Sequence, residues 1–521
     1  MICPSLPPHR GGITSPLGDE GANNKFDMFK KLLYSLHRIL GTILSILFLV
    51  WFLSGFVMIY HTFPKVANRD KYAHMDAVSG YMPEIDSIIN SNHVGNAVNK
   101  LTLRDFDGHS YFEVVAEKGS YKLPADTNIL SIGSPAYTQI ENYAKKWSDA
   151  EIARVDTLYK LEQWIPFGYL RKDFPIYKFY FDDEKKHQLY VSSVTGEALQ
   201  FTNKDSRFWA WVGAIPHWVY FTKLRQDSQL WIDVVVWLSG IGCIMCIAGI
   251  ILGIRSYIVQ HRKKKNWKTP YKKSSYKWHH ILGFVFGIFV FTYVFSGMMS
   301  LATVPKWIVK VHNPDIQKQM FAPKPVVLSD YKLDYRKVIE EYPNQVKRIE
   351  WTYFGDVPLY KVIIDNKEKV IDASGEELKP LSVTEQMIKD KLSKTHSEPI
   401  TITELHEYDN YYVGTSNHLP LPVYKAELAD ADNSTYYINP KNGNTRYFNT
   451  NTKVRRWSYQ VLHSWELGFL VKRPVLWNIV MWVTMIGGTL VSLTGVWLGL
   501  KYIKRKSKRL KKYLYAQKNK H

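Results

Sequence analysis

The chain has 521 residues, a formal net charge of +21 and a hydrophobic fraction of 46%. This length exceeds that of one ordinary core and indicates two or more domains. The positive charge lies mainly beside long apolar segments, which argues against a nucleic-acid partner. No Gly-x-Gly-x-x-Gly follows a predicted strand and no P-loop occurs, so no recognised nucleotide site is expected. His-Glu-x-x-His and Gly-x-Ser-x-Gly are also missing, which excludes the zinc-protease and serine-hydrolase classes that carry them.

Four stretches lack Asp, Glu, Lys and Arg altogether: residues 39–60, 234–254, 281–304 and 474–500. Each exceeds the ~20 residues that a helix needs to cross a bilayer, so we expect four membrane spans in contact with lipid. The segment 262–277 holds eight Lys and Arg and no acid, and a second basic run follows the last span. An excess of Lys and Arg marks the cytoplasmic side, which predicts cytoplasmic termini and two long inserts on the outer side.

The expected organisation follows from these spans. In chain order it comprises a disordered N-terminus (1–27), span one (28–61), an outer insert (62–206), an interfacial segment with span two (207–256), a basic cytoplasmic loop (257–278), span three (279–304), a second outer insert (305–455), an interfacial segment with span four (456–500) and a basic cytoplasmic tail (501–521). The inserts contain no cysteine, so they must fold without disulfides. Cys243 and Cys246, inside span two, are interpreted as small packing residues.

The sequence repeats itself in two halves. An offset of 242 places Tyr34, His37, Gly41, Ser54 and Gly55 on Tyr276, His279, Gly283, Ser296 and Gly297. An offset of 246 places His217, Trp231 and Gly249 on His463, Trp477 and Gly495. Each half has two spans and returns to the same side of the membrane, so the pattern predicts an internal two-fold duplication with an axis along the membrane normal.

Both inserts contain segments that alternate apolar and polar residues around Asn, Asp and Gly turns, which is the pattern of hairpins. The clearest are "PIYKFYFDDEKKHQLYVSSVTGEALQF" (175–201), "PLYKVIIDNKEKVIDASGEELKPL" (358–381) and "PVYKAELADADNSTYYINPKNGNTRYF" (422–448), with a weaker one at 109–124. The stretch 383–394 reads as a helix. We therefore expect each insert to be a pair of small α+β modules, and the fold class to be a four-span α-helical membrane bundle with two extracytoplasmic α+β inserts.

These hairpins resemble PepSY modules, and the spans, with "LHRILG" at one entry and "LHSWELG" followed by Trp at the other, resemble the PepSY-associated transmembrane helix family. Members with four spans and two outer inserts are similar to di-haem reductases of the bacterial inner membrane that reduce ferric siderophores in the periplasm. The resemblance thus implies a b-type haem protein with two haems. Its partners would be quinol or a separate cytoplasmic electron donor and a periplasmic ferric siderophore or similar Fe(III) chelate.

Histidines at the span entrances are the candidate haem ligands, because an ionisable group in or near the membrane is costly unless it is used. Two axial imidazoles give a six-coordinate haem iron suited to electron transfer. We expect His37 and His279 to form a pair at the cytoplasmic side, and His217 and His463 a pair at the outer side. Two further candidates rank second: His280, which aligns with Arg38, and His61, which aligns with Thr303. No catalytic residue is assigned.

A rival interpretation has no catalysis. PepSY modules also occur as binding or inhibitory domains, so the chain could be a membrane-anchored regulator that holds a periplasmic partner. Substitution of His37 and His279 would separate the two, since only a reductase would lose haem. A haem or metal transporter would require a polar path through the spans, and the apolar stretches contain no acid to line one.

Overall fold

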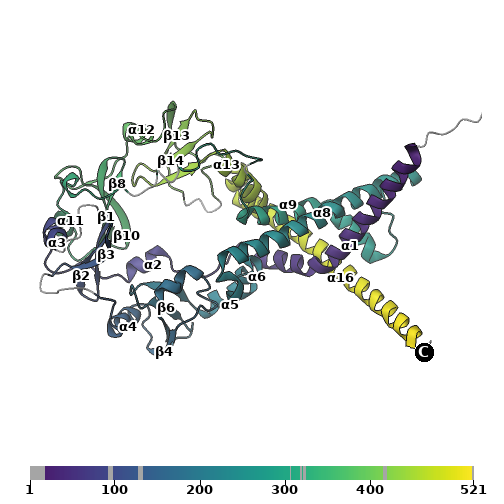
Figure 1. The fold of residues 1–521 in the computed structure, drawn as a ribbon, viewed down its shortest axis with the longest axis horizontal. Coiled ribbons are helices and arrows are strands. Elements are labelled where there is room, and N and C mark those ends of the chain that lie inside the picture. Colours follow the sequence, from purple (N-terminus) through teal and green to yellow (C-terminus); the bar gives the residue numbers. More distant parts are fainter. Residues whose placement is uncertain are drawn as a thin grey trace, which may run out of the picture. The chain divides into compact units, whose positions relative to one another are not determined.

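The computed structural model describes residues 18–91, 98–126, 133–305, 307–316, 320, 324–414 and 419–518. The chain divides into two compact units. Unit 1 contains the described residues up to Phe52, Ser239–Val294 and the chain from Ile486 onward, and unit 2 contains Leu53–Leu238 and Phe295–Met485. Figure 1 labels the elements along the chain.

Four long helices are apolar enough to cross a membrane: α1 (Gly18–Met58), α8 (Ser228–Lys264), α9 (Ser274–Leu301) and α16 (Pro474–Lys518). They confirm the four predicted spans. All four run beyond the predicted limits at one end: α1 begins at Gly18, α8 ends at Lys264, α9 begins at Ser274 and α16 ends at Lys518. For α1 and α16, no proline interrupts the chain from residue 17 to 63 or after Pro474, so helix propagates outward from the apolar segments. Residues 18–27, which were expected to be disordered, are therefore part of α1, while residues 1–17 lie outside the described residues.

Glycine and phenylalanine interlock between the helices of unit 1. A Cβ atom on Gly488 would lie 2.3 Å from Cε1 of Phe52, and one on Gly242 would lie 2.7 Å from Cζ of Phe48. Both phenylalanines are at most 5% exposed. Small residues let helix backbones approach closely in lipid, so these glycines fix the spacing of α1 against α8 and α16.

The largest sheet of unit 2 has seven strands in the order β11-β10-β9-β8-β1-β2-β3. The strands are β1 (Val98–Phe106), β2 (His109–Ala116), β3 (Gly119–Pro124), β8 (Val346–Phe354), β9 (Val357–Ile364), β10 (Lys367–Asp372) and β11 (Lys379–Pro380). At the centre β1 pairs with β8 in antiparallel register, with Leu103 opposite Ile349, and both side chains are fully buried. The expectation of separate modules in each insert is thus corrected: one module of each insert contributes to a shared sheet with one core.

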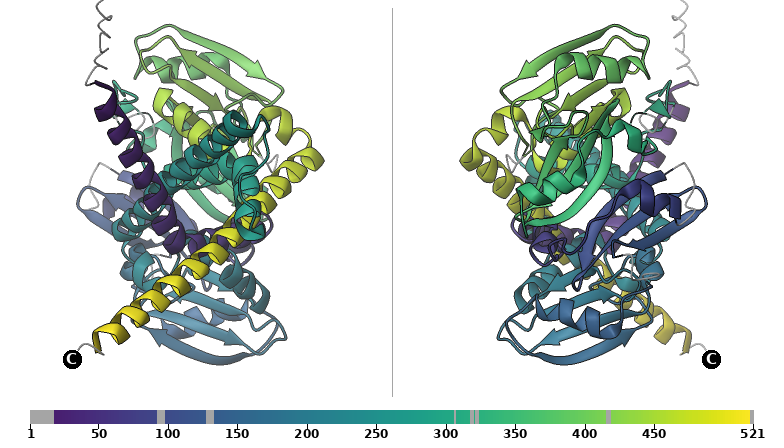
Figure 2. Two further views of the ribbon diagram at one scale, coloured as in Figure 1. Left: turned by 90° about the vertical axis from the view of Figure 1, so that its right-hand side faces the viewer. Right: turned by 90° about the vertical axis from the view of Figure 1, so that its left-hand side faces the viewer.

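Two four-stranded sheets complete the inserts. They are β4 (Ile152–Leu158), β5 (Ile176–Phe181), β6 (Gln188–Ser192) and β7 (Ala198–Thr202), and β12 (Ile400–Leu405), β13 (Val423–Leu428), β14 (Thr435–Ile438) and β15 (Thr445–Phe448). Helix α4 (Tyr137–Lys145) packs its buried residues on the first sheet and α12 (Glu385–Ser393) on the second, seen in blue and green in Figure 2. The predicted hairpins and the predicted helix at 383–394 are confirmed.

Short helices and loops connect these elements. They are α2 (Asn68–Ala73), α3 (Ile85–Ser91), α5 (Lys204–Val212), α6 (Ala214–Trp218), α7 (Thr222–Arg225), α11 (Tyr335–Glu341), α13 (Thr450–Arg456), α14 (Leu462–Ser464) and α15 (Gly468–Val471), with 3₁₀ turns at Gly168–Asp173 and Leu328–Asp330 and a π turn at Trp457–Val461. Before α8 the chain folds back through α6 and α7.

Element lengths recur between the two halves. Strands β1, β2 and β3 have 9, 8 and 6 residues, and β8, β9 and β10 have the same lengths in the same order. The left-handed residues Val219 and Trp465 also correspond, since each lies two positions after its histidine, His217 or His463. So do two hydrogen bonds of 2.7 Å, donated by the indole of Trp231 to the Trp218 carbonyl and by that of Trp477 to the Ser464 carbonyl.

Candidate functional site

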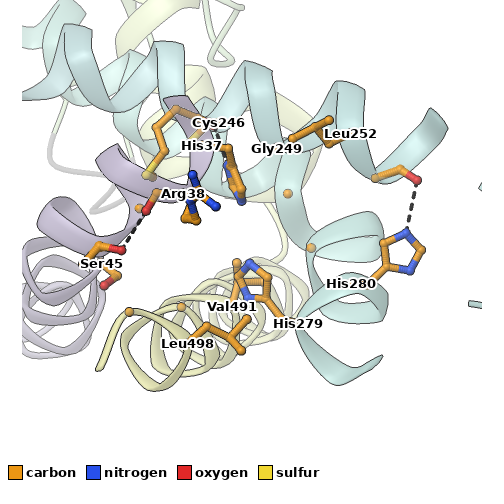
Figure 3. Close-up of a pocket in the computed structure, with 18 of the residues that line it drawn as sticks. His37, Arg38, Ser45, Cys246, Gly249, Leu252, His279, His280, Val491 and Leu498 are labelled. Atoms are coloured by element: carbon orange, nitrogen blue, oxygen red, sulfur yellow. Dashed lines mark hydrogen bonds between the residues drawn. The ribbon is translucent and has the colours of Figure 1, made fainter. Parts of the chain in front are cut away.

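Two of the predicted histidines meet in unit 1. His37 on α1 and His279 on α9 have ring centroids 6.2 Å apart and ring planes inclined by 36°. Figure 3 shows the two rings facing each other across a cavity. The sequence places each histidine close to the start of its apolar run, so the helices carry both side chains to the same end of the bundle.

One ring nitrogen of each histidine is held by a hydrogen-bond partner. Nδ1 of His37 lies 3.1 Å from the carbonyl oxygen of Met245 on α8. Because a carbonyl only accepts, Nδ1 must be the donor and a neutral His37 presents its lone pair at Nε2. Nδ1 of His279 lies 2.9 Å from the hydroxyl of Thr494 on α16. Such partners orient an imidazole and fix which nitrogen can bind a metal.

Glycines leave the space in which these rings lie. A Cβ atom on Gly249 would stand 2.6 Å from Cε1 of His37, so no other residue fits there without moving the ring. Gly495, at the matching position of α16, would place a Cβ atom 3.7 Å from Cε1 of His279. Each ring thus lies against the backbone of a neighbouring helix.

The cavity between the rings has a volume of about 380 Å³. Its walls are mostly apolar or glycine, with Cys246, Val290 and Leu498 among them. The same lining also contains two arginines, four tyrosines and three histidines. These residues are Tyr34, His37, Arg38, Tyr271, Tyr276, His279, His280, Tyr502 and Arg505. This composition suits a flat, largely apolar ligand with a few charged groups.

The other two predicted histidines meet in unit 2. His217 on α6 and His463 on α14 have ring centroids 6.1 Å apart and ring planes inclined by 61°. Each is followed two positions later by the left-handed residue that turns the chain, Val219 or Trp465. The fold-back of these short helices therefore brings the two rings together.

The second pair has the same kind of support as the first. Nδ1 of His217 lies 3.2 Å from the hydroxyl of Ser54, and Nδ1 of His463 lies 3.0 Å from that of Ser296. Cε1 of His217 would be 3.5 Å from a Cβ atom on Gly55, and Cε1 of His463 would be 3.9 Å from one on Gly297. The Ser-Gly dipeptides near the ends of α1 and α9 thus supply the hydroxyl and lie beside the rings.

A buried ion pair lies beside His463. Arg456 is 5% exposed, and its guanidinium donates to Oε2 of Glu466 at 3.2 Å and to the backbone oxygen of Glu466 at 3.0 Å. Burial raises the pKa of Glu466, and the hydrogen bond and charge of Arg456 oppose that rise. The pair closes the turn that follows His463.

The ring separations can be compared with metal coordination. A metal between two imidazoles lies about 2 Å from each nitrogen, and each centroid lies roughly 1 Å behind its nitrogen, so two trans ligands have centroids about 6 Å apart. Both pairs have this separation. Among the described residues no group of three or more His, Cys, Asp or Glu could hold a metal ion. Two imidazoles and the four nitrogens of a porphyrin complete six ligands, so the residues fit haem.

The two second-rank histidines make other contacts. His280 points away from the cavity centre in Figure 3. Its ring nitrogens lie 2.9 Å from the Thr269 hydroxyl and 3.2 Å from the Gly253 carbonyl, and its ring packs on Tyr257. His61 is exposed and stacks on Trp209, with ring centroids 4.4 Å apart. Neither ring faces a second histidine.

Sequence reasoning missed the groups that hold Nδ1. Ser54 and Ser296 correspond at the offset of 242 and were available as a signal, since each is a polar residue in an apolar segment. Thr494 and the carbonyl of Met245 offered no such signal, because they lie far along the chain from the histidines that they contact.

Comparison with known proteins gives one family. The sequence model described as "PepSY-associated TM region" matches residues 34–346, which is more than half of the chain. The match includes three of the four paired histidines, His37, His217 and His279. A search of curated proteins found no match to the chain.

Proposed function

Because this chain belongs to the family of PepSY-associated transmembrane proteins and brings four histidines into two facing pairs, we propose that it is a haem-binding electron-transfer protein. In this proposal it is a b-type oxidoreductase of the bacterial inner membrane that reduces ferric siderophores or similar Fe(III) chelates in the periplasm for iron uptake. Quinol or a separate cytoplasmic protein would donate the electrons.

The observation that carries the proposal is the matched support of the two pairs. In each of the four histidines Nδ1 has a hydrogen-bond partner, and each ring lies beside a glycine, most tightly His37 beside Gly249. An interfacial histidine that only contacts lipid headgroups needs neither feature. Imidazoles held through Nδ1, with about 6 Å between their ring centroids, would be suited to hold a haem iron.

The chain's own residues would bind the two haems, orient the imidazoles and shield them from water. His37 and His279 would hold one haem and His217 and His463 a second, each haem supplying one-electron transfer when bound. The apolar walls of the unit 1 cavity exclude water from His37 and His279. Reduction of the Fe(III) substrate to Fe(II) weakens its bonds to hard oxygen donors, and this releases the metal from the chelate.

We further infer that the chain arose by internal duplication. The equal lengths of β1, β2 and β3 and of β8, β9 and β10 support this inference, as do the corresponding left-handed residues. Each histidine pair takes one member from each half. The basic segments at one end of the spans favour cytoplasmic termini and periplasmic inserts.

Haem content tests the proposal. Protein produced with ample haem should contain about two haems per chain by pyridine haemochrome, with the reduced spectrum of bis-histidine b haem. The double variant His37→Ala/His279→Ala should lose one haem, and His217→Ala/His463→Ala should lose the other. The matched controls His280→Ala and His61→Ala, which alter histidines outside both pairs, should retain both haems.

Reduction of substrate is measured with the same preparation. Dithionite-reduced protein, freed of excess reductant, should be reoxidised by a ferric hydroxamate or catecholate, and each paired-histidine variant should slow this reoxidation at least tenfold. A folded preparation that remains colourless would refute haem binding and would favour the regulator. Haem binding without reoxidation by any ferric chelate would refute only the substrate.

A further inference from the structure

The polar lining of the unit 1 cavity is one-sided in charge. Arg38 and Arg505 line it, and none of its lining residues is Asp or Glu. No carboxylate among the described residues lies within 4.0 Å of either guanidinium as an ion pair. A cationic cavity beside apolar helix surface favours a ligand that carries negative charge.

Both arginines are held in place by tyrosines of the same lining. The guanidinium carbon of Arg38, the residue after His37, lies 5.0 Å from the ring centroid of Tyr502 on α16. Nη2 of Arg505 donates to the hydroxyl of Tyr276 at 2.8 Å, and Tyr276 lies three positions before His279 on α9. One arginine is therefore associated with each histidine of the pair.

We propose that Arg38 and Arg505 bind the two carboxylate groups of the tetrapyrrole whose iron His37 and His279 hold. This inference rests on the proposed function and adds to it the recognition of the ligand's acidic edge. Arginine suits the task because its guanidinium stays charged and donates two parallel hydrogen bonds to a carboxylate. Tyr276 and Tyr502 fix the guanidinium groups before the ligand arrives.

Anionic phospholipid headgroups carry the same charge as a carboxylate and are the other ligands that two arginines beside a membrane could bind. The cavity favours the tetrapyrrole, because the two arginines line the same space as the two imidazoles. Arg38 and Arg505 are exposed, as are lysines that lie outside the lining, such as Lys504 and Lys508, and these lysines remain available to lipid.

The test compares haemin with haemin dimethyl ester, which has the same iron and ring but no ionised carboxylates. Both are titrated in detergent into full-length His217→Ala/His463→Ala protein prepared without haem, so that only the unit 1 site is measured. This protein should bind haemin at least about tenfold more tightly than the ester. When Arg38→Gln and Arg505→Gln are added to this protein, haemin and its ester should bind equally well. The reduction potential of the bound haem should also fall, because two positive charges no longer stabilise the reduced haem.

The control is Arg509→Gln, one turn beyond Arg505 on α16 and outside the cavity lining; it should keep the preference. Retention of the bis-histidine spectrum in the arginine variant shows that the site is still folded.

Binding of neither compound would refute the proposed function itself. Equal binding of haemin and ester before the arginine substitutions, or an unchanged preference and potential after them, would refute the role of the arginines and leave the function standing. Loss of the preference in nanodiscs of anionic lipid, with the preference kept in nanodiscs of neutral lipid, would show that headgroups occupy the arginines and would assign the arginines to headgroups.

Discussion

At the scale of single residues, the glycines beside the histidines differ in how closely they approach the rings. Gly249 is the tightest case, because a Cβ atom there would stand 2.6 Å from Cε1 of His37. An alanine usually stabilises a helix by up to about 1 kcal/mol relative to glycine. A loss on substitution here must therefore come from the ring and not from the helix.

We expect Gly249→Ala to displace His37 and to lower haem content by about half, measured by pyridine haemochrome per folded chain. The matched control is Gly488→Ala on α16. Its added methyl would meet Phe52 and not a histidine, so it should lower the thermal unfolding temperature and leave the haem content per folded chain unchanged. Full haem content in Gly249→Ala would show that the ring position in unit 1 is not a ligand position.

The sequence was sufficient to select the four histidines and to pair them. Their recurrence at two fixed offsets distinguished them from thirteen other histidines, and the structure brings His37 to His279 and His217 to His463. The role of His280 could not be predicted, because it depends on Thr269 in the basic loop. A repeat identifies equivalent positions, whereas a hydrogen-bond partner depends on tertiary packing.

At the scale of elements, the joint between β1 and β8 holds the two inserts in one sheet. Cross-strand neighbours such as Thr102 and Glu350 lie directly opposite each other. Lys361 pairs with Glu350 from the next strand, β9, and so lies two strands away from Thr102, about 10 Å distant.

The double variant Thr102→Cys/Glu350→Cys should therefore form a disulfide on mild oxidation, seen as a linked peptide pair in a non-reducing tryptic digest. A disulfide needs Cα atoms about 4.4–6.8 Å apart, so the control Thr102→Cys/Lys361→Cys should stay reduced. Linkage in the control and not in the test pair would mean that the strands meet in another order.

Hairpins could be predicted from the sequence and the joint between them could not. In the turn after β1, Asp107 and Gly108 both have positive φ, which is the local chemistry of a two-residue hairpin turn. The pairing of β1 with β8 links strands from different inserts, and either strand could have stayed at an edge. Only the shared core, with Leu101, Leu103 and Ile349 fully buried, decides that pairing.

At the scale of the whole molecule, charge is separated along the chain. The loop between α8 and α9 and the last turns of α16 are basic, whereas the inserts mix acids with bases. Long apolar runs made the four spans predictable. The extension of α16 to Lys518 was not, because a basic tail is equally compatible with a solvated helix or with no structure.

Labelling of single cysteines tests the orientation. In a Cys3→Ser background, Ser374→Cys in the second insert should react with a membrane-impermeant maleimide in spheroplasts. Ser507→Cys on α16 should react only after lysis, because cytoplasmic basic segments are shielded by the bilayer. Both serines are exposed, and the remaining cysteines, Cys243 and Cys246, are buried. Reaction of position 507 in intact spheroplasts would invert the topology.

Each histidine pair draws one ring from either side of the loop that joins α8 to α9. A fragment that ends in this loop would contain one histidine of each pair and could complete neither pair. The complementary fragment would likewise contain only the other histidine of each pair. The covalent link between α8 and α9 thus supplies the two members of each pair in a one-to-one ratio. The members need not share the same contacts: Nδ1 of His37 lies near a carbonyl and Nδ1 of His279 near a hydroxyl.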